Sequence, residues 1–149
     1  MQVTWKYNSF NELSPAMLYA ILQLRNEVFV VEQNCVYQDA DNKDYKSFHL
    51  SGWDGDILVA YCRILPPGIS FQDASIGRVV SNPLYRKTGS GRALMALAVQ
   101  KTREQFNCSI ITIGAQLYLK KFYESFGFKQ VGHSYLEDNI PHIEMRWNA

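Results

Sequence analysis

The segment from Arg86 to Arg92 brings two glycines and three cations together directly before a predicted helix. It reads Arg86-Lys87-Thr88-Gly89-Ser90-Gly91-Arg92, and the apolar periodicity that follows predicts a helix over residues 90–106. The first N–H groups of a helix lack intrahelical acceptors, and the helix dipole adds partial positive charge at that end. Gly89 and Gly91 allow the backbone to approach a ligand closely, and the cationic side chains add formal charge. The segment therefore predicts a binding site for a diphosphate.

Two other nucleotide-binding motifs fit the segment less well. A Walker A loop requires Gly-Lys-Ser/Thr at the start of the helix, whereas this chain has Gly91-Arg92-Ala93 and no lysine for the β- and γ-phosphates. A dinucleotide-binding fingerprint requires a third glycine where Leu94 stands, and it normally begins directly after a strand. Here Pro83-Leu84-Tyr85 separates the strand from the loop. The spacing excludes the first motif and disfavours the second.

The elements that must hold this segment in place are strands and helices in mixed order. Ser14 and Pro15 predict a helix start, with serine as the N-cap and proline at the first helical position. Asp54-Gly55-Asp56 lies between two apolar segments and predicts a hairpin turn. The polar segment 32–46 is expected to form a loop or short helix over a site. We expect strands at residues 2–7, 47–53, 57–65, 74–80, 109–114, 129–135 and 142–147, and helices at 14–29, 90–106 and 116–125. This order predicts an α/β fold in a single domain spanning residues 1–149.

The composition is that of an ordinary globular protein and restricts the classes of partner. Hydrophobic residues make up 47% of the 149 residues and charged residues 19%, and no apolar run approaches the roughly 20 residues of a membrane span. A net charge of +1 gives no general attraction to nucleic acid or to acidic lipid. Residues 1–7 do not resemble a signal peptide, so we expect a cytoplasmic protein that binds neither nucleic acid nor membrane. The three cysteines Cys35, Cys62 and Cys108 are far apart in sequence, which favours reduced thiols over disulfides or a metal site.

Two motifs together resemble those of the GNAT superfamily of N-acetyltransferases. Arg86-x-x-Gly89-x-Gly91 resembles the motif with which that superfamily binds the pyrophosphate of acetyl-CoA. The segment Phe122-Tyr123-Glu124-Ser125-Phe126-Gly127-Phe128 is similar to its Tyr-Glu-x-x-Gly-Phe signature. Residues 24–34 and 76–80 are similar to the ElaA-type branch of the superfamily. The resemblance covers most of the chain, from the first helix to the last strand.

This resemblance implies a mixed, mainly antiparallel central sheet with helices on both faces, and acetyl-CoA as the cosubstrate. The strand at 74–80 should diverge from the strand at 109–114 and expose backbone N–H groups at Val79 and Ser81, with Val80 between them, to hold pantetheine and polarise the thioester. Tyr123 matches the family tyrosine that protonates the departing thiolate, and a phenol is suited to donate a proton at neutral pH. Gln116 stands where many members have asparagine, and either contacts the pantetheine arm or caps a helix.

The residue that accepts the proton of the amine is less well determined by the sequence. Glu32, His49, His142 and Glu144 are the ionisable candidates. Glu32 is taken as the catalytic candidate, because it ends the first helix beside the expected acceptor cleft, where its carboxylate would receive an ammonium group or deprotonate it through water. Glu32 is equally consistent with a solvated carboxylate. His49 and His142 are candidates for the substrate site, although a structural hydrogen bond also accounts for His49. Arg63 and Arg78 lie on predicted strands and are expected to pair with acids such as Glu32 or Asp39. Such pairs would either shape the cleft or select an anionic acceptor, and the sequence leaves both options open.

We therefore expect an N-acetyltransferase in which the amine of a small molecule or peptide attacks acetyl-CoA directly, without a metal. No cysteine shows a local nucleophile pattern that would favour an acyl-enzyme route. The alternative is a CoA-binding module without turnover, acting as a sensor or as a partner for another protein. An oxidoreductase that uses a dinucleotide is a third option, disfavoured by the loop spacing. Similar proteins are commonly homodimers, so a homodimer is possible here.

Overall fold

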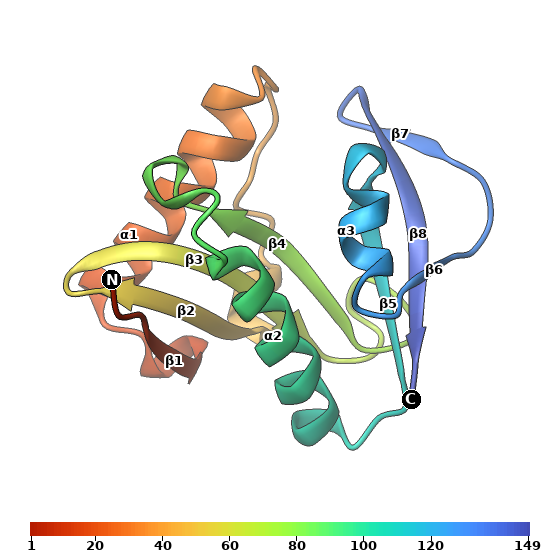
Figure 1. Cartoon of the computed structure of the whole chain (residues 1–149), viewed down its shortest axis with the longest axis horizontal. Helices are drawn as coiled ribbons and strands as arrows, with labels where there is room; N and C mark the ends of the chain where they lie inside the picture. The colour runs from red at the N-terminus through yellow and green to blue at the C-terminus, as the bar shows by residue number, and fades with distance from the viewer.

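The computed structural model describes all residues from 1 to 149, arranged as two antiparallel sheets with helices packed against them (Figure 1). The first sheet has the strand order β1-β2-β3-β4. In the second sheet β8 is central, with β5 and β6 beside it and β7 also paired to it. The strands are β1 (Thr4–Ser9), β2 (Phe48–Asp54), β3 (Ile57–Leu65), β4 (Ser75–Ser81), β5 (Ile110–Gln116), β6 (Lys129–Gln130), β7 (Tyr135–Glu137) and β8 (Ile140–Asn148).

The helical elements include two long helical runs and several short turns. The α-helices are α1 (Pro15–Arg25), α2 (Ser90–Phe106) and α3 (Lys120–Glu124). A π-helical segment, η2 (Asn26–Glu32), continues α1, and the 3-10 turns are η1 (Phe10–Glu12), η3 (Lys43–Lys46), η4 (Pro83–Tyr85) and η5 (Leu117–Leu119). No helix in the chain combines the length and the apolar composition that a bilayer span requires.

Local sequence signals account well for the starts of the two long helices. The side chain of Ser14 accepts a hydrogen bond from the N–H of Met17, and Pro15 occupies the first helical position, as predicted. Helix α2 has the predicted bounds, and Gly89 precedes it in a left-handed conformation with φ of 85°. The prediction of one helix to residue 29 is only partly correct, because the run changes to π-helical geometry at Asn26. Segments of this kind are rare and occur often at functional sites.

The two sheets meet at one end and diverge at the other. Their direct backbone link is an isolated parallel bridge between Ala74 and Ile111, where the N–H of Thr112 donates to the carbonyl of Ala74. Figure 1 shows β4 and β5 close together near the C-terminus and separating from there. The divergence of these two strands, which the family resemblance implied, is therefore present. As a result, β4 has a second edge without a strand partner beyond Ala74.

A β-bulge lies in the middle of β4, where it faces β3. Arg63 pairs with Gly77 and Tyr61 with Val80, so that Arg78 and Val79 together stand opposite one residue of β3. Arg78 adopts a φ of 49°, which is uncommon for a residue other than glycine. A bulge bends the strand and changes the direction of its side chains, and bulges are frequent beside active sites.

Apolar side chains are buried on both faces of the first sheet. One cluster joins this sheet to α2, α3 and the second sheet, and includes Leu50, Ile64, Leu94, Ile113 and Met145. A second cluster packs α1 against the opposite face. Because both faces are covered, β3 is buried along nearly its whole length instead of alternating. Cys35 and Cys62 are buried, Cys108 is half-buried, and all three are free, in agreement with the prediction of reduced thiols.

The C-terminal region differs most from the sequence prediction. The predicted helix at 116–125 is a 3-10 turn followed by a short α-helix, and Gln116 is the last residue of β5 instead of a helix residue. The predicted strand at 129–135 is wrong, because β6 ends at Gln130 and β7 begins only at Tyr135. Asp138 and Asn139, with φ of 50° and 63°, form a tight turn that pairs β7 with β8.

Candidate functional site

A cavity of about 960 Å³ lies where the two sheets diverge. Its lining comes from η2 and the segment after it, from β4, from the loop before α2, from the end of β5 and from α3. Predicted site residues in this lining are Glu32, Arg63, Arg78, Val79, Val80, Ser81, Arg86, Lys87, Gly91, Gln116, Tyr123 and His142. Thr88, Gly89, Ser90 and Arg92 belong to the same loop and helix start but do not line the cavity.

The start of α2 presents free backbone donors beside the cavity. The N–H of Ala93 bonds to the carbonyl of Gly89, whereas those of Ser90, Gly91 and Arg92 have no acceptor in the protein. Gly91 lies next to the end of β4, and a Cβ atom on it would stand 3.4 Å from Ser81 Oγ. The absence of a side chain here keeps the space between the helix start and β4 open, as a site for a diphosphate requires.

The loop before α2 is held by its own hydroxyl groups. Thr88 Oγ1 donates to the carbonyl of Tyr85 at 2.6 Å and lies 3.2 Å from Ser90 Oγ. Lys87 takes a left-handed conformation with φ of 66° and lines the cavity. Thr88 and Ser90 therefore shape the loop, and Lys87 supplies a cation to the cavity.

The three cations of the loop have different surroundings. Arg92 points away from the cavity, since its guanidinium lies 4.9 Å from the centre of the Phe126 ring and donates to Ser125 Oγ. The expected contribution of the Arg92 side chain to the charge of the site is therefore not supported by its position, although its backbone N–H remains at the helix start. Arg86 lines the cavity and donates from both terminal nitrogens to the carboxylate of Glu32, with Nη1 2.9 Å from Oε2.

Glu32 thus pairs with Arg86 and not with Arg63 or Arg78. The hydrogen bonds from Arg86 lower the pKa of Glu32, and the positive charge of Arg86 adds to this effect. The side chains of Glu32 and Arg86 remain 42% and 44% exposed, so the pair lies at the mouth of the cavity.

Tyr123 reaches the cavity from the core side of α3. Its side chain packs edge-on against Phe122 and Phe128, and the residue is only 5% exposed. Burial raises the pKa of its phenol, which therefore stays protonated at neutral pH. Its hydroxyl has no hydrogen-bond partner within the protein, so it is free to donate to a group in the cavity.

Two glutamines join the first helical run to the second sheet across the cavity. Gln33, which directly follows η2, and Gln116, at the end of β5, exchange two amide hydrogen bonds of 3.1 and 3.2 Å. Two residues after Gln33, Cys35 Sγ donates to the carbonyl of Asp138 in the turn between β7 and β8. Gln116 is therefore placed in the lining but is already bonded to Gln33.

His142 is 8% exposed, lines the cavity and pairs in register with Gln116. Its Nδ1 lies 2.7 Å from the carbonyl oxygen of Ile140. Because a carbonyl only accepts hydrogen bonds, Nδ1 carries the proton and Nε2 bears a lone pair in the neutral ring. Glu137 Oε2 stands 3.5 Å from Nε2, and the ring of Tyr135 stacks on the imidazole.

The other two proposed proton acceptors lie outside the cavity. His49 is fully buried, with Nε2 3.0 Å from the carbonyl of Asp44 and Nδ1 2.7 Å from the hydroxyl of Tyr61. Burial lowers the pKa of its imidazole, and both ring nitrogens are used by structural contacts. The site role expected for His49 from the sequence is therefore not supported by its position outside the cavity lining. Glu144, on β8, does not reach the cavity lining either.

A charge cluster of three arginines and three aspartates lies beside the cavity, and Arg63, Arg78 and Asp41 of this cluster line it. Arg25 on α1 is fully buried and pairs with Asp39 at 2.8 Å and with Asp44 at 2.7 Å. Arg63 on β3 donates to Asp41 and to Asp44. Arg78, at the bulge of β4, lies 2.8 Å from Asp39 and stacks on Tyr37. The predicted pairing of Arg78 with Asp39 is confirmed.

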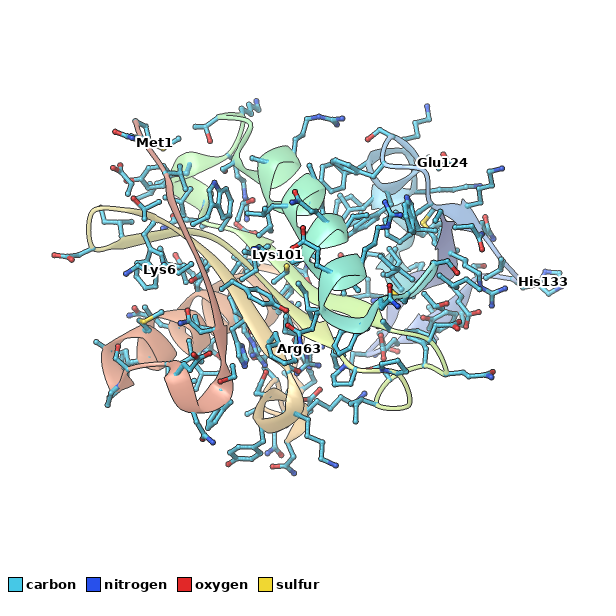
Figure 2. The ribbon with its side chains drawn as sticks, turned by 90° about the horizontal axis from the view of Figure 1, so that it is seen from below. Met1, Lys6, Arg63, Lys101, Glu124 and His133 are labelled. Atoms are coloured by element: carbon cyan, nitrogen blue, oxygen red, sulfur yellow. The ribbon has the colours of Figure 1, made fainter.

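The cluster is neutral as a whole and fixes the polar segment before β2 onto the sheet. Figure 2 shows Arg63 near the centre of the molecule, whereas His133 projects at its edge.

Burial would raise the pKa of Asp44, but hydrogen bonds from Arg25 and the charges of Arg25 and Arg63 outweigh it and lower this pKa. The pKa of Asp41 is lowered in the same way, against burial, by hydrogen bonds from Arg63.

Replacing Asp44 by asparagine is expected to destabilise the fold by about 3 kcal/mol, because it removes the carboxylate that Arg25 and Arg63 share and leaves the buried cluster with one excess positive charge. The lowered pKa values of Asp41 and Asp44 give stability that is full above their ordinary range near pH 4 and is lost as pH falls through their folded-state values. The variant should therefore lose less stability on acidification than the unmodified protein. Urea unfolding at several pH values measures both effects.

The control for this prediction is Asp56→Asn, since Asp56 is exposed in the β2–β3 turn and makes no ion pair. It should change stability by less than about 0.5 kcal/mol. An equal loss in both variants would contradict the structural role of the cluster.

Sequence reasoning missed Arg25 and Gln33. For Arg25 a signal existed, because Ile21, Leu24, Arg25 and Val28 follow the spacing of one helix face, which places a cation on the buried side. For Gln33 no local signal existed, since its partner Gln116 lies far away in sequence.

Comparison with known proteins finds similarity over nearly the whole chain. The family model of the acetyltransferase (GNAT) domain matches residues 16–149. Protein ElaA from Escherichia coli K12 is 43% identical over 145 residues, which cover 96% of this chain and 95% of ElaA. The crystal structure of Escherichia coli ElaA matches with a TM-score of 0.92 and 41% identity, covering 99% of this chain and 100% of that one. The crystal structure of an acyl-CoA N-acyltransferase from Pseudomonas aeruginosa matches with a TM-score of 0.93 and 40% identity, covering 98% and 99%.

Proposed function

This chain belongs to the acetyltransferase (GNAT) family and has its fold, and from this premise we propose that it transfers the acetyl group of acetyl-CoA to a primary amine by direct attack of the amine. The amine is carried by a small molecule or a peptide. The similarity to the Pseudomonas aeruginosa acyl-CoA N-acyltransferase supports an acyl-CoA as the donor.

One observation carries the proposal: the free amides at the start of α2 stand beside the same cavity that Tyr123 and the unpaired edge of β4 line. The amides of Ser90, Gly91 and Arg92, with Lys87 and Arg86, would hold the diphosphate of CoA. The backbone of β4 from Val79 to Ser81 would hold pantetheine, with the bonded pair of Gln33 and Gln116 beside it. The thioester then lies toward Tyr123, on the core side of the cavity.

Tyr123 is proposed as the general acid. As the amine nitrogen attacks the carbonyl carbon and the carbon–sulfur bond breaks, the sulfur takes the proton from the Tyr123 hydroxyl. The burial that keeps this phenol protonated supports the assignment.

His142 is proposed as the general base that accepts the proton of the amine. The bond from Nδ1 to Ile140 fixes the tautomer, so that the Nε2 lone pair is available, and Glu137 stands close enough to stabilise the ring once it is charged. The products are the amide and the free thiol of CoA. Water then carries the proton from His142 back to Tyr123, which restores both residues.

Replacing His142 by asparagine is expected to lower kcat/KM about 100-fold, the usual contribution of a positioned base. Binding of CoA should change much less, because the proposed role of His142 is toward the amine and not toward the cofactor. The control is His133→Asn, because His133 lies on an exposed loop at the edge of the molecule (Figure 2). An unchanged kcat/KM in His142→Asn would remove His142 from this role.

Release of free thiol from acetyl-CoA in the presence of a panel of amines tests the proposed activity. We expect release that depends on the amine and saturates with it. Saturable binding of acetyl-CoA without amine-dependent release would favour instead a CoA-binding module without turnover. That alternative is less well supported, because such a module has no need of a free phenol in the cavity.

A further inference from the structure

The Glu32–Arg86 pair joins a carboxylate of η2 to the arginine of the proposed diphosphate loop. Both side chains line the cavity, and both terminal nitrogens of Arg86 donate to the Glu32 carboxylate. In this state both terminal nitrogens of the Arg86 guanidinium are already occupied, although the same group would fit a phosphate with bidentate geometry. A diphosphate and Glu32 therefore compete for the same donors.

The diphosphate is expected to displace the Glu32 carboxylate from Arg86. It carries more negative charge than one carboxylate, and Lys87 and the free amides of the α2 start stand beside Arg86 to receive it. The Glu32–Arg86 pair, in contrast, is nearly half exposed, and exposed ion pairs are weak.

The backbone of Glu32 stays in place when the side chain is released. The next residue, Gln33, is tied to Gln116 by two hydrogen bonds, and the π-helical geometry holds η2 in continuity with α1. Figure 1 shows this helical run rising on one side of the diverging sheets and the β7–β8 hairpin on the other. A released Glu32 carboxylate therefore remains at the cavity, between its two sides.

The lining holds three other carboxylates, and none of them is paired with Arg86; one of them, Asp138, lies in the turn between β7 and β8. Asp41 is held by Arg63, and Glu137 stands beside His142. A protonated amine that enters the cavity needs an anionic partner before it gives up a proton, and a freed Glu32 supplies one.

We propose that binding of the cofactor transfers Arg86 from Glu32 to the diphosphate, and that the released Glu32 carboxylate then binds the ammonium group of the acceptor. This inference rests on the proposed function, because it requires that the diphosphate of CoA binds at Arg86. It makes Glu32 a binding and positioning residue for the acceptor, with His142 as the base. It also makes the binding ordered, since the cofactor creates the acceptor site.

The test is Glu32→Gln, with CoA binding measured by calorimetry and acceptor kinetics by thiol release. Loss of the competing carboxylate should tighten CoA binding about 3-fold, while loss of the ammonium partner should raise the KM of the amine at least about 10-fold. A simple loss of structure or of general affinity would instead weaken both. The opposite signs of the two effects are therefore specific to the exchange.

Glu27→Gln is the matched control. Glu27 is an exposed carboxylate of the same segment whose charge acts on Arg86 without touching it. In Glu27→Gln, CoA affinity and the KM of the amine should each change less than 2-fold. A small effect there assigns the effects of Glu32→Gln to the lost contact with Arg86 and not to the lost negative charge. In an Arg86→Gln background, Glu32→Gln should no longer tighten CoA binding, because the pair is already absent.

Unchanged or weaker CoA binding in Glu32→Gln, while the unmodified protein binds CoA, would overturn the exchange and leave the proposed function intact. Tightening that persists in the Arg86→Gln background would also overturn it. If the unmodified protein binds no CoA, the proposed function itself fails, and the exchange fails with it.

Discussion

Replacing Tyr123 by phenylalanine is expected to lower kcat about 100-fold and to leave CoA binding nearly unchanged. The substitution removes the proton donor for the thiolate while keeping the ring that packs against Phe122 and Phe128. Because the Tyr123 hydroxyl has no partner in the protein, its removal leaves no buried polar group unsatisfied, so the fold should be retained. Steady-state kinetics with acetyl-CoA and an active amine, together with CoA calorimetry, separate the two quantities.

Tyr19→Phe is the control for this experiment, since Tyr19 is an exposed tyrosine of α1 outside the cavity. It should leave kcat unchanged. A Tyr123→Phe variant that keeps full turnover, with the chemical step shown to be rate-limiting, would contradict the role of Tyr123 as acid. Water would then be the source of the proton.

The second large effect is expected for Gly91→Val. A valine side chain would fill the space between the α2 start and Ser81, where Gly91 now leaves the helix amides open. Losing charge-assisted hydrogen bonds to a diphosphate costs about 3 kcal/mol in total, which corresponds to about 100-fold weaker binding of CoA. The helix itself should tolerate the change, because valine is a better helix former than glycine. Calorimetric titration with CoA measures the affinity.

Ala96→Val adds a similar side chain to an exposed position further along the same helix. It should leave CoA affinity within about 2-fold of the unmodified protein. Equal affinities in Gly91→Val and Ala96→Val would mean that the ligand does not approach the start of α2.

Local sequence is sufficient to predict α2 and its loop, because the features that form them lie within one segment. Apolar spacing defines the helix, and Gly89 can adopt the left-handed conformation that starts it. The strand at 129–135 could not be predicted correctly in the same way. Its residues are divided between β6 and β7 by the tertiary pairing of each with β8, which no local pattern reports.

The candidate site was only partly predictable, because its polar contacts join residues far apart in sequence. Glu32 was identified as a carboxylate beside the cleft, but its partner Arg86 lies 54 residues away. His49 and His142 are the same residue type on similar strands and both are buried, so only their tertiary contacts distinguish them: His49 is held by Asp44 and Tyr61, whereas His142 lines the cavity. Composition and spacing therefore suggest which residues are candidates, and the fold selects among them.

The most direct test of the proposed site compares the binding of acetyl-CoA with that of S-acetylpantetheine, which carries the same thioester but no diphosphate. Calorimetry on the unmodified protein should give saturable binding of one acetyl-CoA per chain and at least about 100-fold weaker binding of S-acetylpantetheine, because the amides of the α2 start have no diphosphate to bind. No measurable binding of acetyl-CoA, or equal affinity for the two compounds, would contradict the assignment of residues 86–92 as the diphosphate site.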